Sequence, residues 1–337
     1  WYDRQAAVNS ILLGCSVGVA GTVLGFIFAF AVTRLSLPKW LCAAVSAVTL
    51  LPLISPPFTS SIALTLSLGP NGILLDFFGL GNFNFYGFWG TFISETLTFF
   101  PVAFMTLSTI LARIDPNLED AAYSLGASSF KVFRTVTLPL AAPGIANAFL
   151  LVFSCSLADF ATPQVLGGHS FPVLPTQAYL VITGMYDFKG GAALSFMLLI
   201  PAIIVYSLQR WWVGKKSYVT VSGKAGGRSS VKGPGPLLSS GIVATVAVVI
   251  AFILYLYAII LTGSLVKVWG VNNEITLENY SYVFTHGSKA IKDTLLIACI
   301  GTPLGGLLAV LVGYATARLK VRGSRILETV SLLNYTL

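Results

Sequence analysis

The chain has 337 residues, of which 55% are hydrophobic and only 9% are charged, and its mean hydropathy is +0.84. These values exclude an ordinary soluble domain, in which about a quarter of the residues are charged. The formal net charge is +8, and where the basic residues lie decides what this charge means.

Apolar segments long enough to cross a bilayer as helices recur along the whole chain. A helix of about 20 residues spans roughly 30 Å of hydrocarbon. An eighth segment begins at Ile326, so the sequence predicts an all-α, polytopic transmembrane helical bundle with about eight spans. The seven complete segments are 11–32, 41–66, 89–111, 141–165, 192–208, 237–261 and 294–317.

The basic residues are distributed unevenly between the two sides of the predicted membrane. If successive spans alternate in direction, 15 of the 20 lysines and arginines fall on one side. Basic residues concentrate in cytoplasmic loops, so this side is predicted to be the cytoplasm. The net charge then follows from the topology, and no nucleic-acid partner is needed. The predicted cytoplasmic loops are 34–40, 113–140, 209–236 and 318–325.

The first predicted span recurs near the end of the chain. Setting Asn9 against Asp293 also aligns Cys15 with Cys299, and the same offset joins Arg34 with Arg318. Internal repeats are common in transporters. We expect a first permease half at 1–211 that lacks its first span, a linker at 212–236 rich in Gly, Ser and Lys, and the start of a second half at 237–337.

The ends of the chain fit this division. The first residue is Trp1, so we expect both ends to be truncation points, with most of the second half lying beyond Leu337. The repeat offset then predicts a second copy of the loop described below near position 404. The first span also carries Gly14, Gly18, Gly21 and Gly25, a small face on which a neighbouring helix can pack closely.

The chain offers little sign of a metal site. Its cysteines, Cys15, Cys42, Cys155 and Cys299, lie inside apolar spans without ligand spacing, and we interpret them as small hydrophobic residues. His169 and His286 are far apart and lack close acidic companions. Any metal ligands therefore stay unknown.

The loop 113–140 has the features of two short helices. Asp115 can cap a helix that starts at Pro116, and Gly126 can end it in a left-handed conformation. A second helix can start at Ser128 or Ser129 and must stop before Pro139. An apolar stripe is predicted at Leu118, Ala121, Ala122 and Leu125, and exposed rings at Phe130 and Phe133.

This loop resembles the EAA loop of permease subunits in binding-protein-dependent ABC importers. The resemblance implies that the loop is the coupling helix, which docks into a groove of a separate ATPase subunit. Two departures are mild, since aspartate replaces the usual glutamate, with Glu119 just before it, and valine replaces isoleucine. The matching residues are Asp120, Ala121, Ala122, Gly126, Val136, Leu138 and Pro139.

Further segments are similar to the fused, double-length permease of the ferric iron uptake type. The resemblance implies a permease of the bacterial inner membrane that imports ferric iron with two copies of an ATPase subunit and an extracytoplasmic binding protein. No phosphate-binding loop is present, so the chain is not expected to be an enzyme; ATP and magnesium belong to the ATPase, and no cofactor is expected on this chain. The similar segments are 86–90, 99–102, 156–163, 166–168 and 215–224.

Several alternatives remain open at this point. Permeases for 2-aminoethylphosphonate, polyamines, thiamine or sulfate share parts of these patterns. A secondary transporter or channel would also show repeats and few buried charges. A membrane enzyme is disfavoured, because polar side chains do not cluster at a membrane face.

Three carboxyl groups in the predicted spans are candidates for the transport path. Charged groups within a bilayer usually face a cavity, and carboxylates would suit a cation such as Fe³⁺. Glu95, Asp159 and Glu328 qualify by position, although a hydrogen-bonded structural role is an equal alternative for Asp159 and the favoured one for the other two. The pair Gly167 and Gly168 could bend the chain at the outer rim, where we expect the gate.

Overall fold

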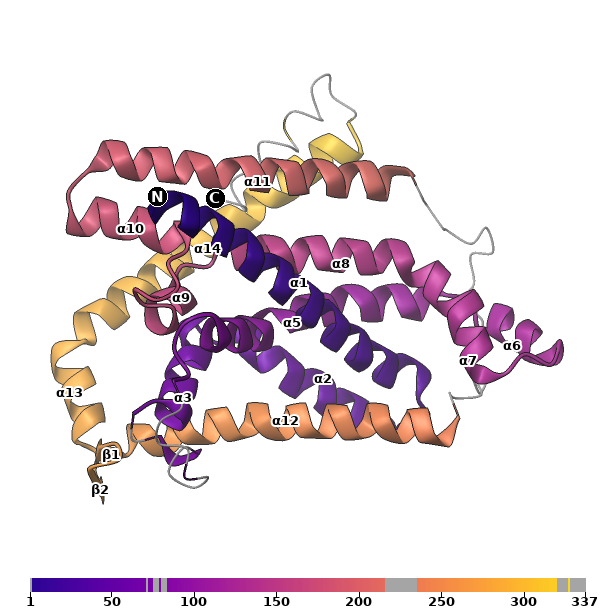
Figure 1. Ribbon diagram of the computed structural model, residues 1–337, viewed down its shortest axis with the longest axis horizontal. Helices are drawn as coiled ribbons and strands as arrows, with labels where there is room; N and C mark the ends of the chain where they lie inside the picture. Colours follow the sequence, from indigo (N-terminus) through magenta and orange to yellow (C-terminus); the bar gives the residue numbers. More distant parts are fainter. Residues whose placement is uncertain are drawn as a thin grey trace. The chain divides into compact units, whose positions relative to one another are not determined.

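The computed structural model describes residues 2–70, 72–74, 79, 84–215, 235–319 and 327. The chain divides into two compact units, Trp1–Ile259 and Ile260–Leu337, and each is described by itself. Nearly all of the described secondary structure is helical (Figure 1), which confirms the predicted helical bundle. Six described helices are long and apolar enough to cross a membrane, and a bent pair would make a seventh span. The eighth predicted span and Glu328 lie outside the described residues, apart from Leu327.

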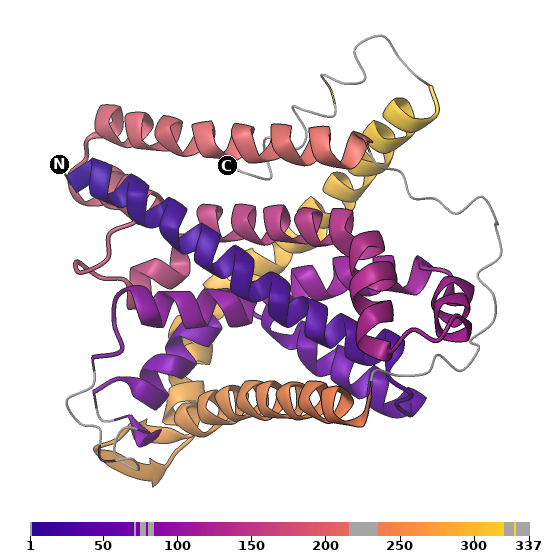
Figure 2. The ribbon, with the colours of Figure 1, turned by 45° about the vertical axis from the view of Figure 1, so that its right-hand side comes forward.

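Three long helices form the core of the first unit. They are α1 (Tyr2–Arg34), α5 (Phe88–Arg113) and α8 (Leu138–Ala158), which lie side by side in Figure 2. The glycine face of α1 allows this packing, because a methyl group added at Gly25 would lie 2.6 Å from the Cβ atom of Ala103 on α5. Large apolar side chains fill the space between the helices, among them Leu13, Val17, Phe28, Phe100, Leu107 and Val152.

The second predicted span is not one straight helix. It consists of α2 (Lys39–Ile54) and α3 (Phe58–Leu68), whose axes differ by 96°. The break falls at Pro56 and Pro57, which have no N–H to continue a helical hydrogen-bond ladder. The Ser61 hydroxyl then meets the Ser94 hydroxyl of α5 at 3.1 Å. Hydroxyl contact therefore helps to fix α3 against the core.

The chain after α8 differs from the predicted fourth span. Helix α8 ends at Ala158, so the span 141–165 is wrong at its end, and a separate short helix, α9 (Ala161–Leu166), follows. Next comes α10 (Leu174–Gly184), which the sequence did not predict because 11 residues are too few for a membrane span. It is tied to α1 by the Leu174 N–H, which donates to the Ser10 hydroxyl at 2.8 Å.

The first unit also contains α11 (Phe188–Lys215) and most of α12 (Pro236–Ser264). Helix α11 contains the predicted span 192–208. Helix α12 follows the predicted linker, of which residues 216–234 lie outside the described part. The repeat assigns α12 to the second half of the sequence, yet its Val246 and Ile253 belong to the core of the first unit. This packing explains why the first compact unit extends to Ile259; the predicted boundaries of the halves stay a prediction.

The second unit contains a departure from the all-α prediction. Strands β1 (Val266–Val268) and β2 (Asn272–Ile275) form an antiparallel hairpin, in which Gly270 has a φ of 75°. This left-handed conformation is easily adopted by glycine. Two more helices follow: α13 (Glu278–His286) and α14 (Ser288–Ala317), the latter containing the predicted span 294–317.

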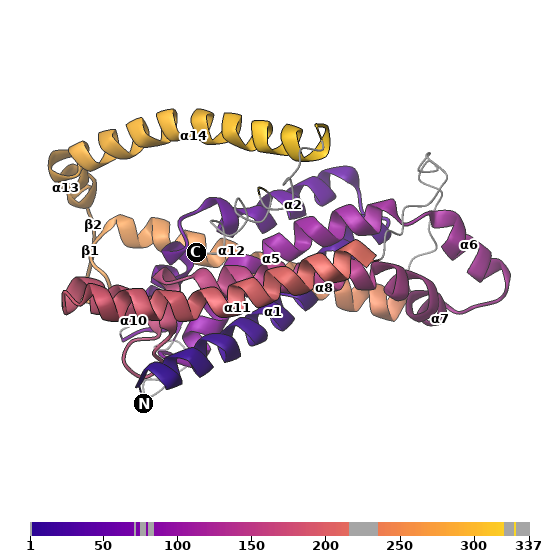
Figure 3. The same ribbon diagram turned by 90° about the horizontal axis from the view of Figure 1, so that it is seen from above.

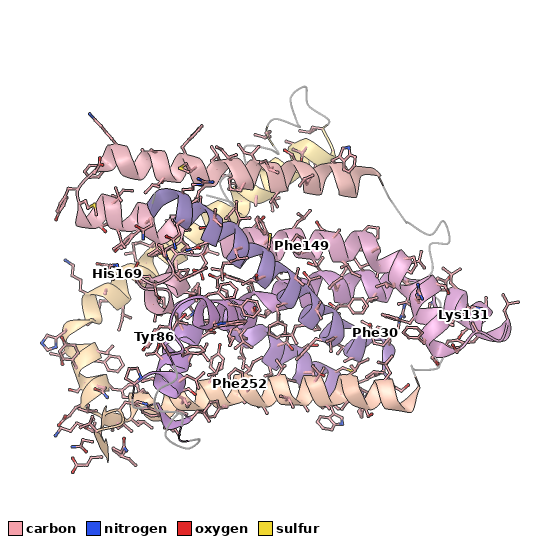
Figure 4. All side chains as sticks on the ribbon, viewed as in Figure 1. Phe30, Tyr86, Lys131, Phe149, His169 and Phe252 are labelled. Atoms are coloured by element: carbon pink, nitrogen blue, oxygen red, sulfur yellow. The ribbon has the colours of Figure 1, made fainter. Side chains whose placement is uncertain are left out.

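The helix ends in the first unit agree with the predicted sidedness. The last residues of α1, α5 and α11 and the first residues of α2 and α12 lie at one end of the unit in Figure 1. Figure 4 places Lys131 at this end, whereas Tyr86 and His169 lie at the opposite end. The helix ends that flank the three predicted cytoplasmic loops of this unit therefore lie at one end, in agreement with the distribution of basic residues.

Candidate functional site

The loop after α5 forms a short helix, α6 (Pro116–Ser124), at the end of the first unit that the basic residues predict to be cytoplasmic. The Asp115 carboxylate accepts a hydrogen bond from the Asn117 N–H at 3.0 Å, and Pro116 occupies the first turn. A capping carboxylate satisfies an N–H that the helix itself leaves unpaired, and proline needs none there. Both features confirm the sequence prediction.

Gly126 makes the turn after α6. Its φ is 79°, and a methyl group added at its Cα would have no heavy atom within 4 Å. The requirement for glycine is therefore conformational and not a matter of space. The Gly126 N–H donates to the Tyr123 carbonyl at 2.9 Å, and the Ala127 N–H to the Ala122 carbonyl at 3.1 Å. These bonds close the end of α6 in the way expected for a left-handed helix terminus.

The second short helix, α7 (Ser129–Val132), begins as predicted, but the helical backbone continues beyond it and past Pro139. The Ser128 hydroxyl caps it by accepting from the Lys131 N–H at 3.4 Å. A π-helical turn, η1 (Phe133–Thr137), then joins α7 directly to α8. Pro139 lies in the first turn of α8, where the missing N–H costs least. The prediction that the proline ends the helix is wrong for this reason.

The two short helices project beyond the end of the bundle, as Figures 1 and 3 show. They carry apolar side chains that the first unit leaves uncovered: Leu125 is 89% exposed and Phe130 is 65% exposed. Phe133 differs from its prediction, because its ring packs edge-on against Phe26 and Phe30 of α1. We call the exposed residues Leu118, Leu125, Phe130 and Leu138 the coupling face.

Glu119 has a different position from its neighbours in the predicted motif. It is only 3% exposed, and its Oε1 atom lies 3.3 Å from Nη2 of Arg34 at the end of α1. The Thr137 hydroxyl donates to the same oxygen at 2.8 Å. Asp120, Ala121 and Ala122 lie further toward the surface of α6. Sequence reasoning named Glu119 but missed Arg34 as its partner; the only signal was the recurrence of arginine at 318.

The structure brings together the two described carboxyl candidates of the transport path. Glu95 on α5 is fully buried, and Asp159, just after α8, is 9% exposed. The Ser156 hydroxyl donates to Glu95, and the Ser156 carbonyl accepts from the Asp159 N–H, so Ser156 bonds to both residues. Glu95 Oε1 and Asp159 Oδ2 are buried without a hydrogen-bond partner among the described residues. Such atoms are rare in native proteins, so the pair stays a candidate.

Asp159 also has a structural task. Its Oδ1 atom accepts from the N–H groups of Ala161 and Thr162 at 3.0 and 3.5 Å, which caps α9. Beyond α9, a methyl group at Gly167 would lie 2.7 Å from the Pro163 carbonyl oxygen, and Gly168 has a φ of 56°. The chain therefore bends at these glycines, as predicted; their role as a gate stays a prediction. His169, one residue on, and His286 belong to different compact units.

Comparison with known proteins identifies the family. Residues 21–217 match the family described as the binding-protein-dependent transport system inner membrane component. The chain belongs to this family. The match covers α2 to α10 completely and includes both the α6–α7 loop and the buried carboxyl pair. Membership of this family confirms that the chain is related to the permeases of binding-protein-dependent importers, as the loop indicated. The alternative of a secondary transporter is therefore set aside.

Individual relatives of this inner membrane component are similar over nearly the whole chain. A ferric transport system permease protein of Actinobacillus pleuropneumoniae is 36% identical over 98% of this chain and 49% of its own length. A putative ferric transport system permease protein of Haemophilus influenzae is also 36% identical, over 98% of this chain and 54% of its own. The chain thus spans about half the length of these relatives.

A more distant relative and a solved structure extend the comparison. A molybdenum transport system permease protein of Escherichia coli is 28% identical over 62% of this chain and 93% of its own length. The crystal structure of a bacterial alginate ABC transporter has a chain that superimposes with a TM-score of 0.54 at 16% identity, covering 62% of this chain and 77% of the other. This likeness shows that the matched part of the chain shares the fold of that transporter chain.

Proposed function

We propose that this chain is part of a permease that carries ferric iron across a bacterial inner membrane, driven by a separate ATPase. The observation that carries the proposal is the coupling face: four exposed apolar side chains that lie on α6, just after α6, on α7 and at the start of α8, at the end of the unit predicted to be cytoplasmic. Exposed apolar groups on a rigid support are typical of a surface that enters a partner's groove.

The motor is expected to be a partner protein. The sequence contains no phosphate-binding loop, so ATP and magnesium would be bound by two copies of an ATPase subunit. Docking of the coupling face would let closure of the ATPase pair pull on α6 and α7. Because η1 joins α7 to α8 without a break, such a pull would reach the membrane-spanning core.

The cargo is proposed from the relatives. The two ferric permease proteins match 98% of this chain, whereas the molybdenum permease matches 62% at lower identity. An extracytoplasmic binding protein would deliver the cargo at the end of the unit that carries α9 and α10. The buried pair Glu95 and Asp159 would suit a cation on electrostatic grounds. A second candidate is a permease of the same class for another solute, such as molybdate, sulfate or a polyamine.

The deciding experiment identifies the cargo. The full-length permease, its ATPase and its binding protein would be reconstituted in liposomes, and transport of radioactive Fe³⁺ would be measured with ATP supplied on the cytoplasmic face. We expect transport that depends on both ATP and the binding protein. Transport of molybdate or sulfate in place of iron would move the proposal to the second candidate.

A further inference from the structure

The cytoplasmic end of α1 carries a charged side chain that is removed from water. Arg34 is the last residue of α1 and is only 6% exposed, and its partner Glu119 is 3% exposed. Nη2 and Oε1 lie 3.3 Å apart, although the residues are 85 positions apart in the sequence. A buried ion pair needs close geometry and further hydrogen bonds to offset desolvation, so this contact depends on what else surrounds it.

Glu119 joins three segments at one point. It belongs to α6, it faces Arg34 of α1, and it accepts the hydrogen bond of Thr137 at the end of η1. The remaining packing of α6 is chiefly against α7 and η1. The ion pair is therefore a polar side-chain link between the first coupling helix and the transmembrane helix α1.

An aromatic contact forms a second link between the loop and α1. Phe133 at the start of η1 packs edge-on against Phe30 of α1, with ring centroids 5.8 Å apart, and against Phe26 at 6.1 Å. The loop is thus held to the cytoplasmic end of α1 by a charged contact from α6 and an apolar contact from η1. Helix α1 in turn packs along α5 and α8.

We propose that Arg34 and Glu119 are positioning residues that pass the movement of α6 to α1, so that ATP hydrolysis and transport stay coupled. This inference rests on the proposed function of the loop. The pair is suited to the task because it is short-range and buried and because Thr137 holds its carboxylate, although Nε and Nη2 of Arg34 have no hydrogen-bond partner among the described residues. Both side chains of the pair are buried, whereas the coupling face is exposed, so the pair would act on transmission and not on docking.

The test uses the full-length permease with its ATPase and its Fe³⁺-loaded binding protein in liposomes. The variants are Glu119→Gln, Arg34→Gln and the charge exchange Arg34→Glu with Glu119→Arg. We expect the single variants to keep the ATPase bound and to keep basal hydrolysis, but to lose about tenfold or more of the hydrolysis stimulated by the binding protein, together with transport. The charge exchange should restore a substantial part of both. Arg134→Gln, an exposed cation of the same loop, is the matched control and should behave as wild type.

Two results would overturn the inference. One is stimulated hydrolysis and transport at wild-type levels in both single variants; the other is loss of the ATPase from the complex, which would make the pair part of docking. If the single variants do not reach the membrane, the charge exchange decides, because it keeps one cation and one carboxylate at this site: insertion at the wild-type level without stimulated hydrolysis and transport would also overturn the inference. Failure of the iron proposal is distinct, because it would appear as absent Fe³⁺ transport in the wild-type permease.

Discussion

The hydroxyl of Tyr257 on α12 lies 2.6 Å from the hydroxyl of Ser55, at the bend between α2 and α3. Two residues earlier on α12, the Tyr255 hydroxyl lies 2.9 Å from the Ser67 hydroxyl at the far end of α3. Helix α12 therefore contacts the bent pair of α2 and α3 at two points. A helix that the sequence repeat predicts to belong to the second half thus stabilises an irregular element of the predicted first half.

Replacing Tyr257 by phenylalanine should weaken this contact without creating a cavity. We expect a loss of about 0.5–1.5 kcal/mol in the free energy of unfolding, the usual net value of one hydrogen bond. Thermal unfolding of the detergent-solubilised protein would measure it. In a double-mutant cycle, the double variant Tyr257→Phe with Ser55→Ala should lose less unfolding free energy than the sum of the two single losses. A loss equal to that sum would mean that the two hydroxyl groups do not interact.

The contact between Gly25 and Ala103 predicts a packing defect. Gly25→Val should push α1 away from α5, because even the first added carbon would lie 2.6 Å from the Ala103 Cβ atom. Overpacking of this kind costs about 1–3 kcal/mol, measured as a lower unfolding temperature. Gly241→Val on α12 is the matched control, since no atom lies within 4 Å of the added carbon. Equal losses in the two variants would contradict the close approach.

Gly126 predicts a defect confined to the coupling loop. A valine there would have to adopt a φ near 79°, which costs an L-residue roughly 1–2 kcal/mol. We expect Gly126→Val to insert into the membrane normally but to lose ATP-driven transport, because the angle between α6 and α7 changes. Gly184→Val is the control, since it also has open space but an ordinary φ. Normal transport by Gly126→Val would show that the turn is not needed.

The coupling face predicts a docking defect without a folding defect. Leu125 is 89% exposed, so Leu125→Asp removes almost no buried apolar surface within this chain. We expect an unchanged unfolding temperature and at least a roughly tenfold weaker association with the ATPase, because a carboxylate would be buried in an apolar groove. Pull-down of the ATPase by the purified permease would measure association. Met185→Asp, at an exposed position of the opposite end, should leave it unchanged.

Asp159 allows its structural role to be separated from a role in transport. Asparagine can still cap α9, whereas alanine cannot and should cost about 1 kcal/mol. We expect Asp159→Asn to unfold like the wild type but to transport Fe³⁺ poorly, because the carboxyl group is lost. Asp159→Ala should be impaired in both measurements. Wild-type transport by the asparagine variant would assign Asp159 to capping alone.

Much of this architecture can be predicted from the sequence. Long apolar segments locate every described span, because the bilayer sets a minimum helix length. The caps at Asp115 and Ser128 and the turn at Gly126 are predictable as well, since they depend on residues close in sequence. The EAA-like spacing by itself indicates the family, because it too is a local pattern.

The rest depends on contacts between distant residues. Pro56 and Pro57 mark a break in the second span, but its 96° angle also depends on contacts such as Ser61 with Ser94. The prediction of an exposed Phe133 is wrong, because nothing local shows that two phenylalanines of α1 lie beside it. Arg34 and Glu119 lie on different helices, and the sequence does not show that the tertiary structure brings these two helices together. Hydropathy likewise cannot find α10, which is too short to produce a span signal.

The π-helical turn η1 sets the direction in which α7 leaves the membrane-spanning helix. Such a turn holds one residue more than an α-helical turn, so deleting one residue from 133–137 would let a regular helix run straight through. Each residue of an α-helix advances about 100°, and everything before the deletion would rotate by that amount. Phe130 would then face a new direction. The direction in which α6 and α7 project is thus determined by the number of residues in η1. A deletion or insertion in η1 would therefore be tolerated far less than a substitution.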